Sequence, residues 1–71
     1  MYPLKNIEAE RARAGMTRKE LADSLNITEK TLRTWTQGVR AVPSDKLLVM
    51  HSLFHCSVDY LLGLTDQREI S

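Results

Sequence analysis

Apolar residues recur three and four positions apart along most of the chain, and no stretch alternates polar and apolar residues one by one. The first spacing places side chains on one face of a helix, whereas alternation would place them on one face of a strand. Leu outnumbers Val plus Ile by ten to seven, and Gly and Pro together total five. This composition also favours helices over strands. The sequence therefore predicts an all-α domain.

Helix starts are indicated by a hydroxyl residue that has an apolar residue just before it and another four positions after it. Such an apolar pair can close as a hydrophobic staple around a capping side chain. Four sets fit: Met16, Thr17 and Leu21; Ile27, Thr28 and Leu32; Pro43, Ser44 and Leu48; Cys56, Ser57 and Leu61. Thr17 and Glu20 have in addition the spacing of a capping box, in which each side chain bonds the other residue's backbone N–H.

Helix ends are indicated by glycines, because glycine readily adopts the left-handed conformation that follows many helices. Gly15, Gly38 and Gly63 stand where three helices are expected to end. With the starts above, they predict five helices, at about residues 4–14, 18–25, 29–37, 45–54 and 58–62. Residues 39–43 form the one real loop. We expect a single domain over residues 1–66 and a flexible tail over residues 67–71.

The predicted second and third helices are joined by the very short segment Asn26-Ile27, which leads directly into the Thr28 cap. So short a link makes the helices cross steeply, which is the geometry of a helix-turn-helix. That geometry needs a small residue where the helices touch, a residue that tolerates left-handed φ, and an inward apolar residue on the second helix. Ala22, Asn26 and Leu32 meet these needs, and Ile27 and Trp35 can complete the buried side. We predict a helix-turn-helix over residues 18–37.

At these residues the chain resembles the Cro/repressor-like (XRE) family of bacterial and phage helix-turn-helix regulators, over about residues 4–66. The matching motifs are Glu10-Arg11 with Gly15, Thr17-x-x-Glu20-Leu21-Ala22, Ile27-Thr28, Trp35-x-x-Gly38, and the run from Cys56 to Gly63. The resemblance implies a five-helix domain whose third helix lies in the DNA major groove. It further implies a cytoplasmic transcription regulator, most plausibly a repressor.

With Leu32 and Trp35 facing inward, the third helix turns a polar face outward. Arg and Lys suit guanine, Glu suits the cytosine amino group, and the Thr methyl suits thymine. The expected base-reading residues are Glu29, Lys30, Arg33 and Thr34. By the resemblance, the residues expected to contact the DNA backbone are Arg18, Thr28, Gln37 and Arg40. Trp35 is expected in the core rather than as a platform for a base.

Two positions depart from the family pattern. The family commonly pairs the arginine of its first helix with an acidic residue of its third helix, but here Arg11 is present and the acidic position holds Thr36. Arg11 then either pairs with Glu8 one turn back or reaches a phosphate. His55 stands where a glycine is common, so the helix before it ends either with left-handed strain or in another way.

Overall charge first argues against nucleic-acid binding, since the formal net charge is only +1 and such binding favours excess positive charge. The charge is unevenly distributed, however. Residues 1–46 hold nine basic and six acidic side chains, whereas residues 47–71 hold one basic and three acidic. The near-neutral total is therefore a cancellation between two ends. It predicts limited non-specific DNA binding and strong dependence on the specific site.

Other chemistry receives little support from these 71 residues. The longest apolar run, Leu47 to Met50, is far too short to span a bilayer, so we expect a soluble cytoplasmic protein. His51, His55 and Cys56 could suggest a metal, but a structural zinc site needs four ligands. Cys56 would need an activating base within a cleft to act as a nucleophile, and the sequence predicts no such cleft. We expect no metal, no cofactor and no enzymatic activity.

An apolar group near the C-terminus suggests self-association. It contains Tyr60, Leu61, Leu62, Leu64 and Ile70. We expect a weak or DNA-assisted homodimer through the fifth helix and the tail, which would place two recognition helices on a palindromic operator. The alternative function is an antitoxin or another protein-interaction module built on the same fold. Such a module would be expected to show an apolar third-helix face.

Overall fold

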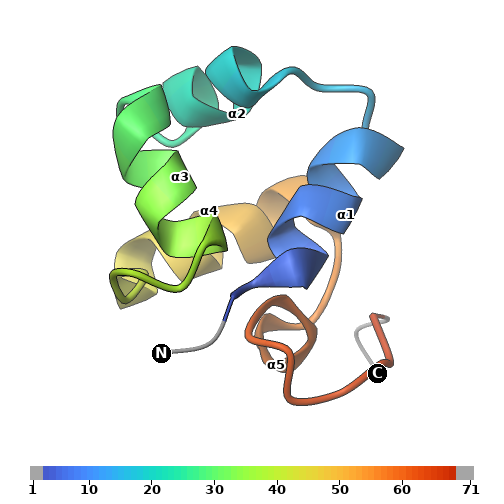
Figure 1. Ribbon diagram of the computed structural model, residues 1–71. Coiled ribbons are helices and arrows are strands. Elements are labelled where there is room, and N and C mark those ends of the chain that lie inside the picture. The colour runs from blue at the N-terminus through green and yellow to red at the C-terminus, as the bar shows by residue number, and fades with distance from the viewer. Residues whose placement is uncertain (1–2, 69–71) are drawn as a thin grey trace.

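The computed structural model describes residues 3–68, which form five α-helices and no strand (Figure 1). The helices are α1 (Lys5–Arg13), α2 (Arg18–Ser24), α3 (Glu29–Thr36), α4 (Ser44–Phe54) and α5 (Val58–Leu61). Each lies within one residue, at both ends, of the span that the sequence predicts. The all-α five-helix fold is confirmed.

Three of the four predicted hydroxyl caps are present. Thr17 Oγ1 accepts from Glu20 N at 3.0 Å, and Glu20 Oε1 accepts from Thr17 N at 2.8 Å, which completes the capping box. Thr28 caps α3 and Ser57 caps α5, each by accepting from the backbone N–H three residues on. These bonds satisfy donors that have no partner within the helix, so the starts of α2, α3 and α5 are fixed locally.

The predicted staple around Ser44 is wrong. Ser44 is the first residue of α4, and Pro43 takes the N-cap position without any side-chain cap bond. Leu48, which was expected to close the staple, is 60% exposed. The φ of Pro43 is locked by its ring and suits the residue before a helix, so α4 starts without a hydroxyl cap.

Asn26 adopts the expected left-handed conformation, and His55 takes the first of the two alternatives left open for it. Asn26 has φ 57° between α2 and α3, and His55 has φ 54° and ψ 46° after α4. The end of α4 therefore carries the left-handed strain that a glycine would relieve. The His51 ring helps close this turn, because Nδ1 lies 2.7 Å from the carbonyl oxygen of Cys56.

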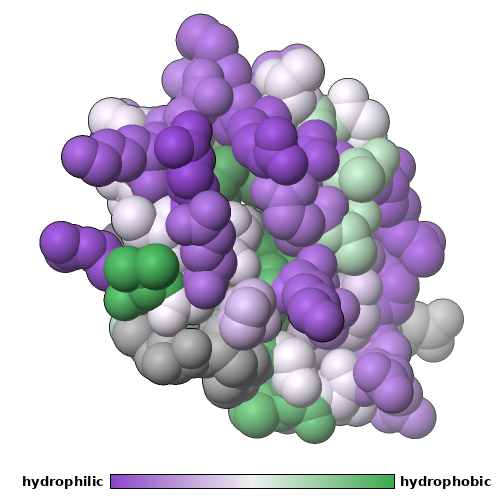
Figure 2. Space-filling view, viewed as in Figure 1, coloured by the Kyte–Doolittle hydropathy of each residue, from purple (hydrophilic) through white to green (hydrophobic). Residues whose placement is uncertain are grey.

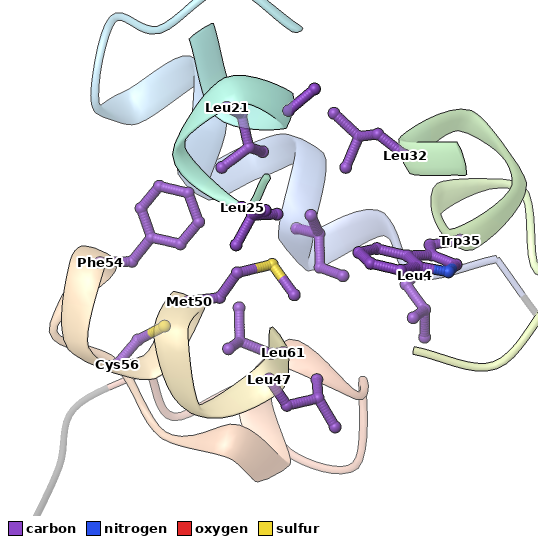
Figure 3. Close-up of a cluster of buried hydrophobic side chains, with 12 residues drawn as sticks. Leu4, Leu21, Leu25, Leu32, Trp35, Leu47, Met50, Phe54, Cys56 and Leu61 are labelled. Carbon is purple, nitrogen blue, oxygen red and sulfur yellow. The ribbon is translucent and has the colours of Figure 1, made fainter. Parts of the chain in front are cut away.

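One apolar core joins all five helices, and Met50 lies near its centre (Figure 3). Packing pairs α2 with α3, α4 with α5, and α1 with both α3 and α5. Ala22, Leu32 and Trp35 are buried as the helix-turn-helix prediction requires, and Ile27 packs partly buried against the core. Burial at these positions fixes which face of α3 turns outward.

The start of the predicted tail makes hydrogen bonds to the rest of the domain. Arg68 Nη2 donates to Glu10 Oε1 at 2.7 Å and to the Phe54 carbonyl at 2.9 Å, while Ser57 N donates to the Arg68 carbonyl at 2.9 Å. Glu10 is a buried carboxylate and therefore needs a partner. Arg68 lies 58 positions away, so no local sequence pattern signals this pair. The flexibility of residues 67–71 stays a prediction, and residues 69–71, including Ile70, lie outside the described residues.

Candidate nucleic-acid interface

Helix α3 divides sharply into a buried and an exposed side. Leu32 and Trp35 are 1% and 4% exposed, respectively, and they hold the helix against the core. Most of the predicted DNA-contacting side chains of α3 are exposed: Glu29, Lys30, Arg33 and Gln37, with Thr34 half-buried. Hydrophilic side chains gather over α2 and α3 in the space-filling view (Figure 2). The predicted outward face of α3 is therefore a polar surface.

A hollow of about 540 Å³ lies on one side of α3 and is called the α1–α3 hollow here. It brings together four predicted residues, Arg18, Glu29, Arg33 and Gln37. Its other lining residues are Lys5, Glu8, Leu32 and Thr36. The backbone bond from Leu4 N to the Thr36 carbonyl, at 3.1 Å, ties the start of α1 to the end of α3. No sequence pattern signals that bond, so the sequence did not place Lys5 and Glu8 next to the predicted DNA-contacting residues.

A second hollow, of about 690 Å³, is formed by α3 and the loop that follows it. It brings Lys30 and Thr34 together with Arg40, the predicted backbone-contacting residue of that loop. Val39, which is 63% exposed, also lines this hollow. Seven of the eight predicted contact residues thus line one or other of the two hollows, and Thr28 lines neither.

The threonine hydroxyls of this region are engaged internally. Thr28 Oγ1 accepts from Thr31 N at 3.2 Å and donates to Thr31 Oγ1 at 3.0 Å. Thr34 Oγ1 donates to the Thr31 carbonyl at 2.6 Å, and Thr36 Oγ1 donates to the Arg33 carbonyl at 3.2 Å. The Thr34 bond commits the hydroxyl proton, which leaves its methyl group and the lone pairs of Oγ1 to an outside partner.

The charged side chains differ in how far they are engaged. Within residues 3–68, Lys30, Arg33 and Arg40 form no ion pair. Arg18, by contrast, contacts Glu8, with Nε 3.2 Å from Oε1. The cations of α3 and its following loop are therefore open to an external anion, whereas Arg18 already has one internal partner.

Arg11 takes the first of its two predicted roles. Its Nε donates to Glu8 Oε2 at 2.9 Å and its Nη1 donates to the Met16 carbonyl at 2.6 Å. Only 19% of the Arg11 side chain is exposed. Burial raises the pKa of the Glu8 carboxyl, but hydrogen bonds from Arg11 and Arg18 lower it by more. The pKa of Glu8 therefore lies below its ordinary value. Glu8 is therefore an anion held between two arginines.

No metal-binding group forms within the described part of the chain: no three His, Cys, Asp or Glu side chains gather there in a suitable arrangement. Cys56 is fully buried, and burial is the main cause that raises the pKa of its thiol. A raised pKa disfavours the thiolate that nucleophilic and metal-binding chemistry require. Among residues 3–68, no helix combines the length and hydrophobicity that crossing a membrane requires.

Comparisons with known proteins agree with this geometry. A helix-turn-helix family model matches residues 7–61. The HTH-type transcriptional regulator ImmR of Bacillus subtilis is 39% identical over 59 residues, which are 83% of this chain and 46% of that protein. The uncharacterized HTH-type transcriptional regulator YobD of the same species is 35% identical over 54 residues, or 76% of this chain and 48% of that protein.

The chain spans about half the length of these curated relatives. No solved structure matches it significantly. The family match nevertheless covers α2, the turn at Asn26 and α3, where the burial pattern and the left-handed turn have the form of a helix-turn-helix. The chain belongs to the Cro/repressor-like (XRE-type) helix-turn-helix family.

Proposed function

We propose that this protein is a transcriptional regulator that acts as a repressor, binds double-stranded DNA in a sequence-specific manner and places α3 in the major groove. The observation that carries the proposal is the outward face of α3, where Lys30 and Arg33 have no ion pair within residues 3–68 and the opposite side of the helix buries Leu32 and Trp35. Uncommitted polar side chains on a rigidly packed helix suit the reading of base edges. Family membership supports the same function.

Base reading is assigned to α3. Arg33 and Lys30 are suited to the O6 and N7 acceptors of guanine, and Glu29 to the amino group of cytosine. The Thr34 hydroxyl is engaged with the Thr31 carbonyl, so its methyl is the group offered to a thymine. These four residues line the hollows on both sides of α3, which matches a helix that contacts both walls of a groove.

Backbone contacts are assigned to Arg18, Thr28, Gln37 and Arg40. Their side chains lie at the start of α2, the cap of α3, the end of α3 and the following loop. Contacts to phosphate orient the protein without reading sequence. Because the positive charge on this face is modest, base contacts must supply much of the useful affinity.

Dimerisation on a palindromic site is part of the proposal. Leu61 is fully buried and belongs to the core, whereas Leu64 is 67% exposed. The apolar surface beyond α5 is thus the part available for a weak or DNA-assisted homodimer. Sedimentation at increasing concentration, with and without operator DNA, tests this, and a strictly monomeric species in both conditions would refute it.

The decisive experiment is selection of bound duplexes from a random oligonucleotide pool. The proposal expects an enriched motif with a strong preference over random duplex DNA, arranged as two inverted half-sites. A protein that enriches no motif would contradict it and would favour the protein-interaction alternative. The hydrophilic face of α3 supports DNA over an apolar docking partner.

A further inference from the structure

The Glu8 carboxylate lies in the α1–α3 hollow among the cationic side chains that a DNA phosphate would approach. Lys5, Arg18 and Arg33 line the same hollow. Glu8 is 30% exposed and contacts two arginines at once, with Oε2 2.9 Å from Arg11 Nε and Oε1 3.2 Å from Arg18 Nε. A carboxylate bound by guanidinium groups uses the same hydrogen-bond chemistry as a phosphate.

The two arginines are held very differently. Arg11 also donates to the Met16 carbonyl and is 19% exposed, so it is fixed as part of the fold. The Arg18 side chain is 65% exposed, and its one hydrogen bond to the described residues goes from Nε to Glu8. An exposed ion pair of this kind is weak and exchanges easily. Glu8 can therefore keep Arg11 while it gives up Arg18.

We propose that Glu8 occupies Arg18 in the free protein as an internal substitute for a DNA phosphate, and that a phosphate of the bound duplex displaces it. Glu8 is then a positioning residue that lowers affinity for DNA through Arg18. The arrangement fits a chain whose net charge is only +1, since it limits non-specific attraction to the duplex backbone. The inference rests on the proposed DNA binding and assigns Glu8 a role within it.

The test measures duplex affinity against salt concentration for the wild type and for Glu8→Gln, which keeps the size and an acceptor oxygen but removes the charge. We expect Glu8→Gln to bind about three- to fivefold more tightly on operator and random DNA alike. The slope of log affinity against log salt should become only slightly steeper, by much less than the about 0.9 of one full phosphate contact, because phosphate already displaces Glu8 from Arg18 in most wild-type complexes.

The matched control is Asp23→Asn, which removes one acidic charge from the exposed Lys19–Asp23 ion pair on α2. Neither residue of that pair lines the α1–α3 hollow. We expect a clearly smaller gain in affinity for this variant. In an Arg18→Ala background, Glu8→Gln should give no more gain than Asp23→Asn, because the proposed effect acts through Arg18. Thermal melting of each variant verifies folding.

Several outcomes would overturn the inference. If Glu8→Gln raised DNA affinity equally with and without Arg18, Glu8 would act only through its general negative charge. If Glu8→Gln bound DNA more weakly, Glu8 would instead hold Arg18 in position for phosphate. A wild type that binds no duplex would refute the proposed function itself. A wild type that binds while Glu8→Gln leaves affinity and salt slope unchanged would refute this inference alone.

The NMR signal of the Arg18 Nε–H group gives a second readout that a purely structural role of Glu8 would not produce. It should shift when duplex is added to the wild type, while the signal of Arg11 Nε–H, which donates to the same carboxylate, stays in place. An Arg18 signal unchanged by duplex in a protein that binds DNA would overturn the exchange.

Discussion

Two charged regions of this domain use their charges in opposite ways. Around Glu10, which is 2% exposed, the carboxylate accepts from Arg68 Nη2 at 2.7 Å and from the Tyr60 hydroxyl at 3.2 Å. On the outer face of α3, Lys30 and Arg33 have no ion pair within the described residues. The first region satisfies its charges internally, and the second leaves them for a partner.

The difference shows where each kind of charge contributes free energy. A buried carboxylate is tolerable only when it is paired, so the Glu10 cluster holds Arg68 against α1 and contributes to the stability of the fold. Exposed cations add almost nothing to folding and remain available for binding. Substitutions in the first region should change stability, and those in the second should change DNA affinity.

The largest effect is expected from Glu10→Ala. The substitution leaves the Tyr60 hydroxyl and the Arg68 guanidinium without their shared acceptor and opens a gap under α1. We expect a loss of about 3 kcal/mol in the free energy of unfolding, measured by urea denaturation. Arg13→Ala, which removes a 63%-exposed partner of the same carboxylate, is the control and should have little effect. Equal losses would contradict the distinction between the buried and exposed sides.

Acid should destabilise the protein through the same carboxyl. Hydrogen bonds from Arg68 hold the pKa of Glu10 below its ordinary value of 4.5. A lowered folded-state pKa gives stability that is present above the unfolded-state pKa and is lost as pH falls through the folded-state value. Denaturation between pH 7 and pH 2 should show this loss, and Glu10→Gln should flatten it. An equally steep acid dependence in Glu10→Gln would exclude Glu10 as its source.

Arg33→Ala should leave the melting temperature nearly unchanged and cost about 1 to 3 kcal/mol of binding on the selected site, with relaxed preference at one base pair. Arg18→Ala should weaken binding to all sequences alike and reduce the salt slope by about one. Titrations on cognate and random duplexes measure both. If the two variants behaved identically on both duplexes, the division into base-reading and backbone-contacting residues would be wrong.

The smallest effect is expected at the end of α4. His55 holds φ 54°, a conformation that glycine adopts without steric cost. His55→Gly should therefore stabilise the protein by about 0.5 to 1 kcal/mol. This net value already subtracts the cost of the greater chain entropy that glycine has in the unfolded state. The matched Asn26→Gly change should gain less, since Asn tolerates this conformation better. Thermal melts compare the two, and a destabilised His55→Gly would show that the His55 side chain outweighs the strain.

Local signals explain which parts of the fold were predictable. The caps at Thr17, Thr28 and Ser57 and the turn at Asn26 depend on residues within a few positions of one another, and each is present in the structure. The predicted staple at Ser44 is absent because Pro43, directly before it, starts the helix without a hydroxyl cap. The buried stripe of α3 follows from helical periodicity, which also predicts its polar face.

Contacts between distant parts of the chain were not predictable in this way. Arg68 bonds Glu10 across 58 positions and Tyr60 bonds it across 50. No periodic pattern encodes such pairs, because they form only after α1 and α5 have packed together. The same holds for Lys5 and Glu8, which reach the α1–α3 hollow only because α1 begins beside the end of α3.

Five helices, a helix-turn-helix and a polar outer face of α3 can be deduced from the amino-acid sequence, since these features depend on local capping, turn chemistry and periodicity. The packing of the helices settled which charges meet across the fold. It paired Glu10 with Arg68 and Glu8 with Arg18, and it left Lys30 and Arg33 without an ion pair within residues 3–68. Pairs between distant residues depend on the three-dimensional proximity of their side chains, and that proximity appears only when the helices have packed around a common core.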